Sequence, residues 1–139
     1  MLLKSIVESM EILEELKGKP LSEIASNRVL AGCMLWNLYT VVQSTIDLTL
    51  KIVVKLRLPS PETYTEAFQI LKQHDIIPGE LAEKLITMVR FRHILAHKYT
   101  SIDLEKAYYI MQNNLDDIKV YLKILRDKLA KRGIRIDQL

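Results

Sequence analysis

Apolar side chains recur along most of the chain at intervals of three and four residues, which is the period of an α-helix. In residues 2–17 they occupy four such positions: Ile6, Met10, Leu13 and Leu16. Gly18 and Pro20 follow, and both residues disfavour continuation of a helix. The pattern therefore predicts a first amphipathic helix over residues 2–17.

A second, longer helix is predicted from Arg28 to about Lys55, and no charged residue occurs from Val29 to Ile46. This uncharged stretch reaches the lower limit of the length that crosses a membrane. Polar residues nevertheless recur on it at helical spacing: Asn37, Thr40, Ser44, Asp47 and Lys51. Such a stripe is costly to place in lipid, so we predict a helix buried in protein on most sides and no membrane partner.

Two shorter helices are predicted in the middle of the chain. The first has Ser60 as its N-cap and Pro61 at its first helical position. Pro78 and Gly79 separate it from the second, which is predicted to continue to Ala96.

The last helix is predicted to begin near Thr100, and it carries a long heptad stripe. Its apolar positions are Leu104, Tyr108, Met111, Leu115, Ile118, Leu122, Leu125 and Leu129. Four or five helices with short connections predict an all-α fold, an antiparallel up-and-down bundle. Because 139 residues suit one domain, we expect a single domain over residues 1–139.

Composition agrees with a soluble helical protein. Hydrophobic residues make up 49% of the chain and charged residues 27%, which excludes intrinsic disorder, and 4 Gly and 4 Pro are too few for many short strands. One cysteine and three histidines exclude an internal disulfide and a cysteine-rich zinc site. We therefore expect a cytoplasmic protein without a metal or other cofactor, and we find no secretion signal. The net charge of +3 is too small to decide function.

One charged residue falls on the apolar side of the fourth predicted helix. Arg92 lies among Leu81, Leu85, Met88 and Leu95 at about 100° per residue. A guanidinium keeps its charge, so it needs an anionic partner, a path to water or a ligand. One interpretation is a structural bundle in which Arg92 forms a salt bridge at the bundle edge; the other is a functional site.

His97 follows Arg92 by five residues, and histidine exchanges protons near neutral pH. An arginine that stabilises a phosphorane-like transition state and a histidine that acts as acid or base could cleave RNA without a metal. In an ideal helix the two side chains lie about 140° apart. Either the helix ends before His97, or two subunits combine their residues across a symmetric interface.

Residues 88–105 read MVRFRHILAHKYTSIDLE. This segment resembles the R-x4-H-x-Y motif of the HepT-like toxins, a branch of the HEPN superfamily of helical ribonucleases. Residues 65–84 also resemble that family, and the resemblance extends over about residues 28–120.

The resemblance implies a metal-independent endoribonuclease toxin of a toxin–antitoxin module. Arg92 and His97 would be its catalytic pair, and His93 would support them at a position where the family usually has Asn. Tyr99 would be adenylylated by a cognate minimal nucleotidyltransferase antitoxin, and the added bulk and negative charge would block RNA. The resemblance also implies a homodimer whose two motifs face a shared cleft.

An alternative function is a non-catalytic helical subunit that binds a nucleotide or a minimal nucleotidyltransferase partner. Partner binding without RNA cleavage would distinguish this alternative from the toxin.

Overall fold

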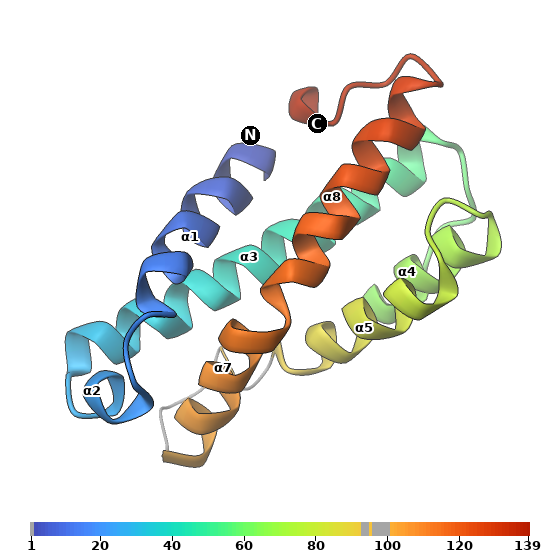
Figure 1. Ribbon diagram of the computed structural model, residues 1–139. Coiled ribbons are helices and arrows are strands. Elements are labelled where there is room, and N and C mark those ends of the chain that lie inside the picture. Colours follow the sequence, from blue (N-terminus) through green and yellow to red (C-terminus); the bar gives the residue numbers. More distant parts are fainter. Residues whose placement is uncertain (1, 93–94, 96–100) are drawn as a thin grey trace.

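The computed structural model describes residues 2–92, 95 and 101–139, and every regular element in these residues is a helix (Figure 1). The all-α prediction is confirmed. The helices in chain order are α1 (Leu2–Leu16), α2 (Leu21–Ala25), α3 (Arg28–Lys55), α4 (Tyr64–Gln73), α5 (Gly79–Arg90), α7 (Ser101–Asn113), α8 (Leu115–Ala130) and the 3-10 helix η1 (Ile136–Gln138).

Helix α3 is the centre of the bundle. It contacts α1, α2, α4, α5 and α7, while α8 packs against α5 and α7. Helix η1 contacts α1 and α8, so the segment after α8 returns to the end of the bundle where α1 begins (Figure 1).

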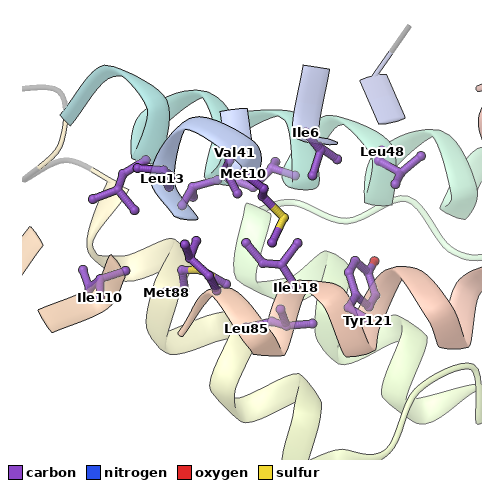
Figure 2. Packing of buried hydrophobic residues seen from close by; sticks show 14 of the residues in the cluster. Ile6, Met10, Leu13, Val41, Leu48, Leu85, Met88, Ile110, Ile118 and Tyr121 are labelled. Carbon is purple, nitrogen blue, oxygen red and sulfur yellow. The ribbon is translucent and has the colours of Figure 1, made fainter. Parts of the chain in front are cut away.

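The core is formed by apolar side chains to which every described helix contributes. Figure 2 shows several of them converging: Ile6, Met10 and Leu13 of α1, Val41 and Leu48 of α3, Leu85 and Met88 of α5, Ile110 of α7, and Ile118 and Tyr121 of α8. The apolar residues that recur every three or four positions lie on one face of each helix. The helices pack together because this packing buries those faces.

Helix α3 is long and apolar enough to cross a membrane, but 56% of its most hydrophobic window is buried inside the protein. The predicted polar seam is also present. Asn37 and Ser44 are buried, Thr40 and Asp47 are half-buried, and the Asn37 amide donates to the Cys33 carbonyl at 2.8 Å. The prediction of a helix buried on most sides is confirmed.

The predicted start of α4 is wrong by three residues. Thr63, not Ser60, is the N-cap, and its hydroxyl accepts the backbone N–H of Glu66 at 3.1 Å. The Glu66 carboxylate in turn accepts the backbone N–H of Glu62 at 3.2 Å. These reciprocal bonds resemble a capping box and hold the start of α4 at Thr63.

The predicted helix from Glu80 towards Ala96 is also interrupted. Helix α5 ends at Arg90, and Phe91 is its C-cap, with a backbone N–H that donates to the Met88 carbonyl at 3.1 Å. This bond spans three residues, as in a 3-10 helix, rather than the four of an α-helix. It closes the last turn of α5 without a glycine or a proline.

The predicted last helix is divided in two. Asn114 separates α7 from α8, with φ −114° and ψ −9°, yet its N–H still donates to the Ile110 carbonyl at 2.9 Å. The apolar stripe continues across the break, because Met111 and Leu115 on either side of it are both buried. In that stripe only Tyr108 and Leu122 are half-buried. The predicted start near Thr100 lies outside the described residues.

A buried hydrogen bond joins α8 to α3. The Tyr121 hydroxyl lies 2.5 Å from the Thr49 hydroxyl, and Thr49 donates its own hydrogen to the Thr45 carbonyl at 2.8 Å. Tyr121 is therefore the donor to Thr49. Burial raises the pKa of Tyr121 well above its usual range, so the phenol stays protonated at neutral pH.

We expect Thr49→Val to lower the free energy of unfolding by about 1–3 kcal/mol, because it leaves the buried Tyr121 hydroxyl without an acceptor. Tyr121→Phe should cost about 1 kcal/mol, because Thr49 keeps its bond to Thr45. Urea unfolding measures both. The double variant should cost less than the two single variants together, and strict additivity would show that the two hydroxyls do not interact.

Candidate functional site

Arg92 lies two residues beyond α5, at the edge of the apolar core. Its predicted apolar neighbours are all buried: Leu81, Leu85, Met88 and Leu95. The Arg92 side chain itself is half-buried and extends to α3, where its Nε–H donates to the Gln43 Oε1 atom at 2.6 Å. The hydrogen bond fixes the arginine against the middle of the central helix.

Two tyrosine rings flank the guanidinium of Arg92. Its Cζ atom lies 5.9 Å from the ring centroid of Tyr39 on α3 and 5.3 Å from that of Tyr64, the first residue of α4. The faces of aromatic rings carry negative partial charge and attract a cation at such distances. Arg92 is thus held by two helices besides the chain that follows α5.

No carboxylate pairs with Arg92 in the part of the chain that the structure describes. The ion pairs found there belong to lysines and to Arg135. The salt bridge that a purely structural interpretation requires is therefore not found among these residues.

The amide of Gln43 has a defined orientation. Its Nε2 donates to the Asp47 Oδ1 atom at 3.0 Å, one helical turn later, and its Oε1 faces Arg92. The partners of Arg92 are thus a neutral amide and two neutral rings. These neutral partners leave the positive charge of the guanidinium uncompensated, so it can attract an anion.

The other predicted site residues, His93, His97 and Tyr99, lie outside the described residues. Their roles remain predictions. The described residues hold no group of three His, Cys, Asp or Glu side chains that could bind a metal ion.

Sequence reasoning missed Gln43, Tyr39 and Tyr64 as neighbours of Arg92. The one available signal was the predicted polar seam, because Gln43 lies four residues before Asp47 on that helix. The two tyrosines gave no such signal.

An all-helical bundle with a half-buried arginine at the start of an R-x4-H-x-Y segment agrees with the resemblance to the helical ribonucleases of the HEPN class. The family model for the ribonuclease HepT-like proteins matches residues 6–125. The chain belongs to this HepT-like ribonuclease family, and the resemblance seen in the sequence is confirmed.

Several known proteins are similar to this chain. The mRNA nuclease HepT of Shewanella oneidensis is 24% identical over 105 residues, which cover 76% of this chain and 79% of that protein. A crystal structure of a toxin–antitoxin pair with AMP-PNP matches with a TM-score of 0.82 at 21% identity, covering 91% of this chain and 95% of the other.

A tri-AMPylated Shewanella oneidensis HEPN toxin in complex with its MNT antitoxin matches with a TM-score of 0.81 at 21% identity. It covers 91% of this chain and 94% of the other. At these identities the structural likeness establishes a common fold.

Proposed function

We propose that this HepT-like ribonuclease is a metal-independent endoribonuclease and the toxin of a toxin–antitoxin pair. Arg92 binds the scissile phosphate and stabilises the charge of the transition state. His97 acts as general base or acid, and His93 helps to orient the phosphate.

The reaction uses the ribose 2′-OH as nucleophile. A base removes its proton, the 2′ oxygen bonds to the neighbouring phosphorus, the bond from phosphorus to the 5′ oxygen breaks, and an acid protonates the departing oxygen. DNA has no 2′-OH, so the substrate is RNA.

The environment of Arg92 is the observation that carries this proposal. The Nε–H of Arg92 is anchored by Gln43, its Cζ atom lies over two tyrosine rings, and none of its described partners is anionic. Anchoring of this kind fixes the direction of the positive charge without neutralising it. The guanidinium fork matches the geometry of phosphate, as it does that of a carboxylate.

The decisive experiment is RNA cleavage in excess EDTA by the unmodified protein and by His97→Ala purified identically. We expect the wild type to cleave a mixed tRNA and mRNA substrate, and His97→Ala to be about 100- to 10,000-fold slower. Intact mass first verifies that Tyr99 carries no AMP. Equal rates in both proteins would refute the role of His97, and binding of a nucleotidyltransferase without any cleavage would favour the non-catalytic alternative.

The antitoxin in this proposal is a minimal nucleotidyltransferase that adenylylates Tyr99. The similar Shewanella toxin is AMPylated and bound to an MNT antitoxin, which supports a partner of this class. Tyr99 follows Arg92 by seven residues in the same motif. In this proposal the negative phosphate of an AMP group on Tyr99 pairs with Arg92 and competes with RNA.

We also propose that the protein acts as a homodimer through α3. One face of α3 presents half-buried or exposed residues at alternating spacings of four and three: Val29, Cys33, Trp36, Thr40, Gln43, Asp47, Leu50 and Val54. Val29, Trp36 and Val54 are 79%, 67% and 76% exposed. Large apolar side chains on such a seam are typical of a surface that a second helix covers.

A second copy is the occupant that this seam fits best. The seam passes through Gln43, so a two-fold axis near its middle would bring the Arg92 residues of both copies into one cleft. The site would then be assembled from both subunits.

We expect Trp36→Glu to weaken the dimer by about 30-fold or more, because it places a charge in the apolar part of the seam. Sedimentation equilibrium measures this change, and cleavage should fall with the loss of dimer. Val120→Glu is the control, since Val120 is a half-exposed valine on α8, away from the seam. A dimer that tolerates Trp36→Glu as well as Val120→Glu would exclude this interface.

A further inference from the structure

The Gln43 amide separates a positive side chain from a negative one. Arg92 Nε–H donates to Gln43 Oε1 at 2.6 Å, and Gln43 Nε2 donates to Asp47 Oδ1 at 3.0 Å. The order is therefore guanidinium, amide, carboxylate. The amide of Gln43 has an oxygen that accepts hydrogen bonds and an NH2 group that donates them, so its effect on Arg92 depends on which of the two faces the guanidinium.

Asp47 favours the same orientation of the Gln43 amide that Arg92 requires. A glutamine amide can present either its oxygen or its NH2 group, and only the oxygen can accept the Nε–H of an arginine. An ionised carboxylate only accepts hydrogen bonds, so it attracts the NH2 end. Because Asp47 lies one turn after Gln43 on the same face of α3, it turns the oxygen of Gln43 towards Arg92.

The neutral amide also protects the charge of Arg92. A carboxylate at position 43 would form a direct ion pair with the guanidinium and compete with a phosphate. Gln43 instead anchors Nε and leaves the positive charge unpaired among the described residues. The Cζ atom of Arg92 also lies over the rings of Tyr39 and Tyr64, which attract the cation without neutralising it.

We propose that Gln43 is a positioning residue for Arg92 and that Asp47 positions Gln43. The inference rests on the proposed function, in which Arg92 binds the scissile phosphate. It predicts that residues outside the R-x4-H-x-Y motif, on α3, control the rate of RNA cleavage. Gln43 and Asp47 act through the direction of the guanidinium and touch neither substrate nor histidine in this proposal.

The test measures two quantities in each variant: hydrogen exchange at Arg92 Nε by NMR, and kcat/KM for RNA cleavage in EDTA. The Nε signal is assigned by its absence from Arg92→Lys. Gln43→Met removes the acceptor, so Nε–H exchange should accelerate and kcat/KM should fall about tenfold or more. Gln43→Glu keeps an acceptor and adds a competing charge, so exchange should stay slow while KM for RNA rises.

Asp47→Asn tests the orientation of the amide. Asn can donate as well as accept, so it no longer selects one orientation of Gln43, and Nε–H exchange should accelerate with a loss of kcat/KM. In the Gln43→Glu background the same change should have no effect on exchange, because both oxygens of Glu accept. Asp127→Asn, on an exposed position of α8, is the matched control for the change in charge.

The two readouts separate this inference from the proposed function. The positioning role is wrong if Asp47→Asn leaves Nε–H exchange unchanged. It is also wrong if Asp47→Asn accelerates exchange as much in the Gln43→Glu background as in the wild type. If exchange responds as expected but the wild type cleaves no RNA, the positioning role stands and the proposed function fails. If exchange responds and cleavage falls in parallel, both are supported.

Discussion

Arg92→Ala should slow RNA cleavage by about 100- to 1,000-fold while the protein remains folded. The loss follows from removal of the charge that binds the phosphate. Stability should change by only about 1 kcal/mol, because Arg92 is half-buried and its described partners are a neutral amide and two rings. Single-turnover cleavage and a thermal melt of the same preparation measure the two effects.

Arg92→Lys is the matched control. It keeps one positive charge but lacks Nε and the planar fork, so we expect an activity between those of the wild type and Arg92→Ala. Removal of one member of a buried ion pair costs about 3–5 kcal/mol. A fall of that size in the stability of Arg92→Ala would identify Arg92 as a structural residue and remove it from the catalytic pair.

Adenylylation of Tyr99 should abolish RNA cleavage. The substitution Tyr99→Phe should prevent this adenylylation and leave cleavage intact. After incubation with the cognate nucleotidyltransferase and ATP, the wild type should gain the mass of AMP and lose its activity against RNA. Tyr99→Phe should keep both its mass and its activity, because it lacks the phenol oxygen that would accept the AMP but retains Arg92 and His97. Intact mass spectrometry and the EDTA cleavage assay measure the two results.

Tyr109→Phe controls for tyrosine replacement in general. Tyr109 is strongly exposed on α7 and lies outside the motif, so its replacement should leave both modification and cleavage as in the wild type. A mass gain that persists in Tyr99→Phe and disappears in Tyr109→Phe would transfer the modification to α7.

The sequence predicted the helices whose apolar faces are long enough to show a period. Helix α1 buries all four residues that its spacing selects, and α8 buries all of its stripe residues except Leu122. Helix α2 was missed because five residues are too few to reveal a period. The break at Asn114 was missed because one residue outside the helix does not disturb the stripe on either side.

Arg92 could be predicted because a charge among apolar positions is visible in a local pattern. Its partners could not, since Gln43 lies 49 residues earlier and meets Arg92 only through packing of α3 against the end of α5. The acid–base role of His97 was inferred from its residue type and its place after Arg92, whereas the role of Tyr99 came from the resemblance to a family. The confirmed family membership makes both residues the first to test.

The order of guanidinium, amide and carboxylate has a consequence for genomes. A single base change in a glutamine codon gives glutamate, and at position 43 this change would neutralise Arg92 while every residue of R-x4-H-x-Y stayed intact. By the proposal above, such a gene would encode a folded protein with a raised KM for RNA. Surveys that count active toxins by the motif alone would include it, and reading position 43 together with the motif would separate the weakened copies.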